Sequence, residues 1–173
     1  SLLFLMSLVA CGQSPDVTAN AKGNKIGEET IKIGVNMELS GAVAAYGTAE
    51  YNGIKLAVKE INANGGIDGK MIELIAKDNK SEIAEASTTA TNLAVQSQVT
   101  TIIGPATSGA TAASSLESQK TGVPLLTPSG TQDDLTINKD GSTKDYVFRT
   151  TFKDSFQGQV LAQFAAENMN AKK

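Results

Sequence analysis

Residues 104–109 (GPATSG) join a predicted strand to a predicted helix and hold the strongest candidate for chemistry in this sequence. A helix start presents backbone N–H groups without intrahelical partners, and partial positive charge accumulates there. Together with the hydroxyl of Ser108, these groups would receive a carboxylate. The same spacing is also that of an ordinary N-cap formed by Thr107 or Ser108, and the two roles are compatible.

Two further segments could complete such a site. Residues 128–131 (PSGT) follow another predicted strand and offer carbonyl oxygens, at Ser129 among others, and the hydroxyl of Thr131, which suit an ammonium group. Tyr46 lies in a predicted loop of small residues, 38–47, where it would form an aromatic wall over a ligand or pack on the surface.

The composition argues for binding rather than catalysis. The 173 residues contain no histidine and one cysteine, which removes the commonest general base and metal ligand and leaves no Cys/His pair. The net charge of −3 argues against nucleic acid as a partner. The glycine-rich stretch 65–70 follows a helix and precedes a strand, the wrong order for a phosphate loop. The adjacent carboxylates Asp133 and Asp134 are more typical of a solvated cap than of acid/base catalysis. We expect no enzyme activity, no metal and no cofactor.

The elements that would position these loops alternate along the chain. Apolar and alternating patterns predict strands, and helical spacing of apolar residues predicts helices between them. We predict N-caps at Ser81 and Asp154, the latter with Gln157 three residues on. The expected fold is α/β, a three-layer doubly wound parallel sheet with helices on both faces. The predicted strands cover residues 31–37, 71–76, 100–103, 123–127 and 147–149, and the predicted helices follow residues 47, 81, 105 and 154.

The N-terminal part has a different character. The apolar run 2–10 is too short to span a bilayer, has the size of a signal-peptide core, and leads into Cys11. Residues 8–11 (LVAC) resemble a bacterial lipobox, which implies lipidation of Cys11 and a membrane anchor. Residues 1–11 are then part of a signal peptide. The polar stretch 12–29 predicts a flexible tether, with order beginning at Ile31.

In order and spacing, segments from Ile31 to the end resemble the leucine/isoleucine/valine-binding family of type I periplasmic-type solute receptors, which serve ABC importers. The resemblance implies two α/β lobes that close over a ligand, with lobe one at 30–150 and the start of lobe two at 151–173. We therefore expect the sequence to be an N-terminal fragment. The segments that carry the resemblance are 31–35, 39–47, 53–57, 61–67, Asp78, 103–108, 124–131, 148–151, Asp154 and 157–158.

The resemblance also implies roles for residues. Ser108 would hold the ligand carboxylate, Thr131 would contact both its amino and carboxylate ends, and the Ser129 carbonyl would face its ammonium. Tyr46 would line the pocket, and Ala106 would supply a backbone contact. Residues 129–130 are Ser-Gly where some members have Ala-Ala, which leaves the backbone contacts possible.

The implied protein is an extracytoplasmic lipoprotein that binds Leu, Ile or Val and docks on ABC permease subunits. Two alternatives stay open. One is the same fold with an amide, urea or another small solute as ligand, and the other is a sensor module of a receptor.

Overall fold

The computed structural model describes residues 23–27, 29–169 and 171. Five parallel strands form one sheet in the order β2-β1-β3-β4-β5. The order of elements along the chain is β1 (Thr30–Met37), α1 (Ala44–Ala63), β2 (Met71–Asp78), α2 (Ile83–Thr91), the π-helical turn η1 (Asn92–Gln96), β3 (Thr101–Ile103), α3 (Ser108–Thr121), β4 (Leu125–Thr127), β5 (Val147–Arg149) and α4 (Asp154–Asn168).

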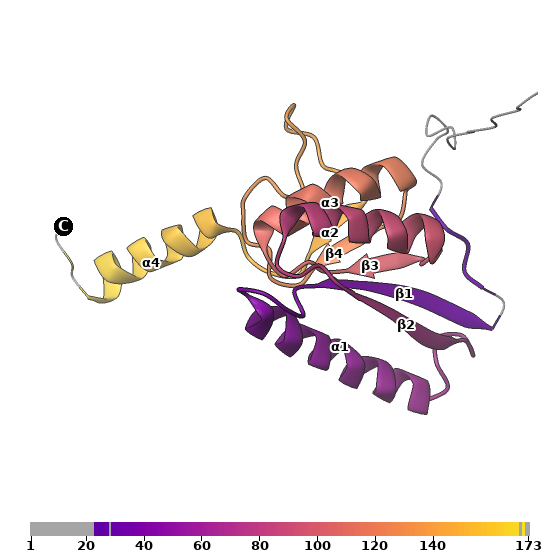
Figure 1. The fold of residues 1–173 in the computed structure, drawn as a ribbon. Helices are drawn as coiled ribbons and strands as arrows, with labels where there is room; N and C mark the ends of the chain where they lie inside the picture. The colour runs from indigo at the N-terminus through magenta and orange to yellow at the C-terminus, as the bar shows by residue number, and fades with distance from the viewer. Residues whose placement is uncertain (1–22, 28, 170, 172–173) are drawn as a thin grey trace, which may run out of the picture.

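Helices cover both faces of this sheet. Helix α1 lies on one face, and α2 and α3 lie side by side on the other (Figure 1). Consecutive strands along the chain are connected through a helix or a long loop, as parallel strands require. The predicted three-layer, doubly wound α/β fold is confirmed.

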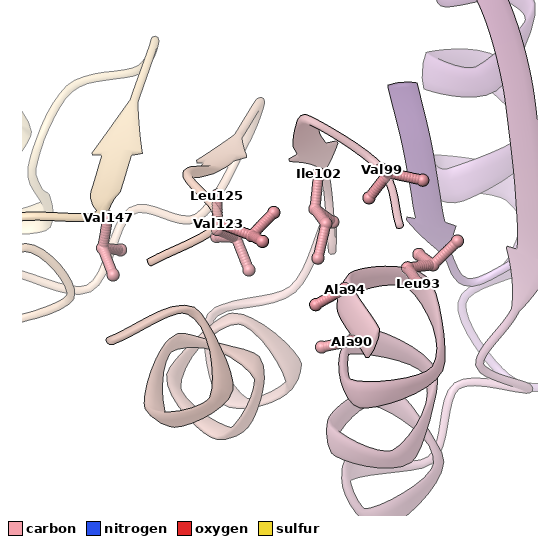
Figure 2. Close-up of a cluster of buried hydrophobic side chains, with 8 residues drawn as sticks. All are labelled: Ala90, Leu93, Ala94, Val99, Ile102, Val123, Leu125 and Val147. Atoms are coloured by element: carbon pink, nitrogen blue, oxygen red, sulfur yellow. The ribbon is translucent and has the colours of Figure 1, made fainter. Parts of the chain in front are cut away.

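The larger apolar cluster lies between the sheet and the layer of α2, η1 and α3. Its strand side chains point toward the helices, where small residues allow close packing (Figure 2). The cluster consists of Ala90, Leu93, Ala94, Val99, Ile102, Val123, Leu125 and Val147. A second, smaller cluster around Val35 and Met37 packs under α1, against Tyr51 and Ile54. The sheet is therefore fixed on both faces, and its loops start from rigid strand ends.

Three predicted helix starts differ in detail. Helix α1 begins at Ala44, so the predicted loop 38–47 is too long and Tyr46 lies in the first turn of the helix. Ser81 does not cap α2, whose N-cap is Glu82 without a side-chain bond. The Ser81 hydroxyl instead accepts a hydrogen bond from the backbone N–H of Val43, the residue just before α1, at 3.2 Å.

The predicted capping box at Asp154 is also wrong. Lys153 is the N-cap of α4, and it makes no side-chain cap bond. The start of α4 is held from outside the helix, because Asp133 Oδ1 accepts from the Ser155 N–H at 3.1 Å. Asp133 thus caps the start of α4, which agrees with the cap role predicted for the carboxylate pair Asp133 and Asp134.

Structure begins earlier than the predicted Ile31. The side-chain amide of Asn24 donates to the carbonyl oxygens of Ala94 (2.6 Å) and Val99 (2.9 Å), and the Gly23 N–H donates to Thr121. These acceptors lie at or near the turns that precede β3 and β4. The last part of the predicted tether is therefore attached at the amino ends of the strands.

Helix α4 extends away from the sheet (Figure 1). Its apolar side chains are exposed, with Phe156 56% and Leu161 61% accessible. None of the helices within the described ranges is long and apolar enough to cross a membrane.

Candidate functional site

A cavity of about 280 Å³ opens at the carboxyl ends of β3 and β4, beside the start of α1. In open α/β sheets this edge is where ligands bind. All five residues predicted from the sequence as ligand contacts line it. The lining consists of Val43, Tyr46, Ala106, Thr107, Ser108, Ser129 and Thr131.

Ser108 is the first residue of α3, and it is half-buried. Neither Thr107 nor Ser108 acts as a side-chain N-cap of this helix, because the N-cap Thr107 makes no such bond. The Ser108 hydroxyl accepts from the backbone N–H of Gln132 at 3.2 Å and can still donate its own proton. Its N–H, in the first helical turn, has no intrahelical acceptor. The start of α3 therefore offers donors to an anion in the cavity.

Glu38, which the sequence analysis did not single out, fixes the loop before α3. Its carboxylate is fully buried and accepts from the N–H groups of Ala106 (3.0 Å) and Thr107 (3.1 Å) and from the Thr107 hydroxyl (2.7 Å). Three donors compensate the cost of burying this carboxylate. Glu38 thus satisfies the N–H groups ahead of α3, and Ser108 is left facing the cavity.

A close approach of α1 holds Glu38 in place. A Cβ atom on Gly47 would lie 2.3 Å from the carbonyl oxygen of Glu38, so only glycine fits at this point of the helix. The first turns of α1, including Tyr46, are thereby seated directly over the end of β1. Tyr46 itself is 67% exposed, with one side on the cavity.

Ser129 connects the loop after β4 to the loop before α3. Its hydroxyl lies 2.9 Å from the carbonyl oxygen of Ala106 and is also hydrogen-bonded with Glu50 Oε1. Burial raises the pKa of the Glu50 carboxyl, the Ser129 hydrogen bond opposes that rise, and the charge of Glu38 adds to it. The backbone of Ala106 is therefore held on both sides, its N–H by Glu38 and its carbonyl by Ser129.

A buried threonine adds a second connection between the same loops. The Thr127 hydroxyl donates to the Pro105 carbonyl at 2.7 Å and accepts from the Gly130 N–H at 3.0 Å. Because Thr127 is the last residue of β4, this bond sets both loops relative to the strand end.

Arg149, at the end of β5, holds the loop that carries Thr131. Its guanidinium donates to the carbonyl oxygens of Thr131 (3.3 Å), Gln132 (2.9 Å) and Asp133 (2.8 Å). The Thr131 carbonyl also accepts from the Asp154 N–H at 3.0 Å. The backbone of Thr131 is thus engaged by β5 and by α4, and the residue lines the cavity.

Asp78, at the end of β2, does not line this cavity. Burial opposes its ionisation, but hydrogen bonds from the Ser40 hydroxyl and from the N–H groups of Lys80, Leu39 and Ser40 outweigh that effect and lower its pKa. Its role is to hold the loop between β1 and α1. Nor does it cap α2.

Another cavity, of about 420 Å³, lies at the amino ends of β1 and β3, where Lys25 and Lys32 are among its lining residues. It is at the opposite edge of the sheet from the loops described above. Among the described residues, no group of three or more acidic or cysteine side chains is placed to hold a metal ion.

The first cavity combines hydrogen-bond donors near Ser108 with carbonyl and hydroxyl oxygens near Ser129 and Thr131, and no charged side chain lines it. This arrangement can bind a small molecule that carries both a carboxylate and an ammonium group.

The sequence did not predict four residues that support the cavity lining, namely Glu38, Glu50, Thr127 and Arg149. Only Glu38 and Arg149 had a signal, as charged residues at the ends of predicted strands.

The chain matches the family model described as "Periplasmic binding protein" over residues 30–173. It is 37% identical over 143 residues to the Leu/Ile/Val-binding protein BraC3 of Rhizobium johnstonii, a match that covers 83% of this chain and 38% of that protein.

Two solved structures are similar. One is LivJ of Streptococcus pneumoniae, a branched-chain amino acid transporter substrate-binding protein in complex with isoleucine, with 58% identity and a TM-score of 0.75 over 83% of this chain and 40% of that one. The other is an ABC transporter solute-binding protein of Rhodopseudomonas palustris in complex with 3,4-dihydroxybenzoic acid, with 26% identity and a TM-score of 0.71 over 82% and 37% of the two chains.

The chain thus spans about two fifths of the length of these relatives. The family model extends from the first strand of the sheet through α4 and includes every residue that lines the cavity at the carboxyl ends of the strands. The chain belongs to the periplasmic binding protein family.

Proposed function

We propose that the protein carrying this chain is an extracytoplasmic solute-binding protein that captures a branched-chain amino acid for delivery to an ABC transporter. One observation carries the proposal: the start of α3, with Ser108, and the loop after β4, with Ser129 and Thr131, meet at one cavity that no charged side chain lines. The LivJ complex with isoleucine supports the choice of ligand, because that protein is 58% identical to this chain.

In this proposal the ligand carboxylate binds at the N–H and hydroxyl of Ser108. The ammonium group binds between the Ser129 carbonyl and Thr131, and the Ala106 carbonyl supplies a further acceptor. Tyr46 covers the ligand from the side of α1. Binding is the whole function in this proposal, with no catalytic step, cofactor or metal. It needs neither a histidine nor a Cys/His pair, which the sequence lacks.

We further propose that residues 30–150 form the first of two lobes and that 151–173 begin the second. The exposed apolar side of α4 supports this division, because Phe156, Val160 and Leu161 would be buried against a second lobe. Cys11, proposed as the site of lipidation, and the signal segment before it lie outside the described residues. The anchor would hold the protein at the membrane that contains the permease subunits.

Calorimetry on the complete gene product tests the function. Isoleucine, leucine and valine are each titrated, and we expect micromolar or tighter binding of at least one. Saturating isoleucine should also raise the melting temperature, since a ligand that binds only the folded state stabilises it. Absence of binding for all three would contradict the proposal.

A second ligand class is favoured by one observation, the 3,4-dihydroxybenzoic acid complex of the R. palustris relative. That ligand has a carboxylate but no ammonium, so it would use the Ser108 side of the cavity only. Thermal-shift measurements with aromatic acids, amides and urea beside the amino acids distinguish the two classes.

A further inference from the structure

Glu50 lies behind the cavity and not in its lining. It is one helical turn after Tyr46 on α1, and its carboxylate Oε1 is hydrogen-bonded with the Ser129 hydroxyl. The other oxygen, Oε2, is buried and has no hydrogen-bond partner among the described residues. The hydrogen-bond connection from Glu50 to a ligand in the cavity therefore runs through Ser129.

The Ser129 hydroxyl cannot donate to both of its neighbours at once. The Ser129 hydroxyl lies within hydrogen-bond distance of both Glu50 Oε1 and the Ala106 carbonyl, but it has a single proton. If Glu50 is protonated, it donates to Ser129, and Ser129 donates to Ala106. If Glu50 is ionised, Ser129 donates to Glu50, and the Ala106 carbonyl loses that donor. The protonation of Glu50 thus decides where the hydroxyl points.

The surroundings of Glu50 raise its pKa and so favour the protonated form relative to a free carboxyl. From the end of β1 the facing charged group is Glu38, whose carboxylate repels a second negative charge. The loops before α3 and after β4 present Ala106 and Ser129, which do not titrate. On α1 itself the titratable neighbours are Tyr46 and Tyr51. No cation is in salt-bridge contact with Glu50 among the described residues.

We propose that Glu50 is a positioning residue that couples amino-acid binding to the loss of its proton. This rests on the proposed function above, in which the Ser129 and Ala106 carbonyls receive the ammonium group. Ionised Glu50 withdraws the Ser129 hydroxyl from the Ala106 carbonyl, which is then free to accept from the ammonium. It also places a negative charge behind the carbonyls that face that cation. Binding therefore strengthens as Glu50 ionises, and a bound ammonium lowers the affinity of Glu50 for its proton.

The test is calorimetry of the complete gene product with isoleucine from about pH 4 to pH 8, an interval that starts near the ordinary pKa of a glutamate carboxyl and extends in the direction of the shift. We expect the wild-type Kd to fall severalfold across this range and protons to be released into the buffer on binding. Glu50→Gln keeps the shape and one donor but cannot ionise. It should bind roughly threefold to tenfold more weakly at pH 8 and show neither the pH slope nor the proton release.

Two variants accompany Glu50→Gln. Ser129→Ala breaks the connection at its other end and should also flatten the pH profile, which keeps the test informative if one variant folds poorly. Glu60→Gln changes an exposed carboxylate on the same helix and should retain the wild-type profile.

The failures are distinguishable. If the wild type binds no branched-chain amino acid, the proposed function is wrong, and this inference falls with it. If the wild type binds isoleucine but Glu50→Gln keeps the wild-type pH slope and proton release, the role of Glu50 alone is refuted.

Discussion

Thr107 donates two hydrogen bonds to one oxygen of Glu38, from its N–H at 3.1 Å and from its hydroxyl at 2.7 Å. The strand end of β1 and the loop before α3 are thereby joined across 69 residues of sequence. Because this contact is fully buried at Glu38, it fixes the start of α3 independently of any ligand.

Replacing Glu38 tests that contact. Glu38→Ala leaves the N–H groups of Ala106 and Thr107 without acceptors, and we expect the free energy of unfolding to fall by about 2–4 kcal/mol. Glu38→Gln retains one acceptor and should cost less. Urea denaturation of the complete gene product measures both, with the exposed Glu60→Ala as control, expected to lie within about 0.5 kcal/mol of wild type. Wild-type stability of Glu38→Ala would refute the role.

The ligand contacts are tested by truncation of single hydroxyls. Ser108→Ala and Thr131→Ala should each weaken amino-acid binding by about 1–3 kcal/mol, because each leaves a polar ligand group without its partner. Calorimetry with isoleucine measures the change. Unchanged affinity in both variants would place the ligand elsewhere.

Arg149 acts on Thr131 through three carbonyl oxygens. Arg149→Lys keeps the charge but replaces a planar fork of donors by a single ammonium that cannot reach all three acceptors. We expect affinity for isoleucine to fall by about 1 kcal/mol, as for the loss of one hydrogen bond, with the fold intact by circular dichroism. An affinity equal to wild type would show that the loop keeps its conformation without the fork.

The lowered pKa of Asp78 predicts an acid-side effect on stability. A carboxyl whose pKa is lower in the folded than in the unfolded state stabilises the protein above the unfolded value of about 3.9, and this contribution is lost as the pH falls through the folded value. Asp78→Asn should therefore be less stable than wild type at neutral pH, and the difference should shrink below about pH 4. Thermal melts from acid to neutral pH measure this, and Asp145→Asn, an exposed change, should follow the wild type. A gap that stays constant with pH would contradict it.

Two glycines of α1 form a matched pair. A Cβ on Gly47 would lie 2.3 Å from the Glu38 carbonyl oxygen, whereas a Cβ on Gly53 would meet nothing within 4 Å. Gly47→Ala should destabilise the protein by about 1–3 kcal/mol through forced displacement of backbone. Gly53→Ala should stabilise it by about 0.5–1 kcal/mol through helix propensity. Equal effects of the two changes would show that α1 is not seated on Glu38.

The fold could be predicted from the sequence because alternation and apolar runs identify strands, and their alternation with helices implies parallel pairing. The residues around the cavity were also predictable, since 104–109 and 128–131 each follow a strand and must meet at one sheet edge. The exact helix starts were not, because Ser81 and Asp154 have the residue types of caps while their surroundings supply other partners.

The contacts that support the cavity lining could not be predicted from the sequence, for a physical reason. Glu38 and Thr107 are neighbours only in the folded chain, and so are Glu50 and Ser129, 79 residues apart. Nothing local to a glutamate in a helix indicates that it will lie under a loop from the other half of the sheet.

The attachment of Asn24 has a mechanical consequence. Its two hydrogen bonds hold the chain to the carbonyl oxygens of Ala94 and Val99, at the edge of the sheet opposite the cavity. A pull transmitted along the chain from ahead of Gly23 would load these two bonds and the bond from the Gly23 N–H to Thr121, all near the amino ends of the strands. The loops at 104–109 and 128–131 lie at the other ends of the strands, away from these points of attachment.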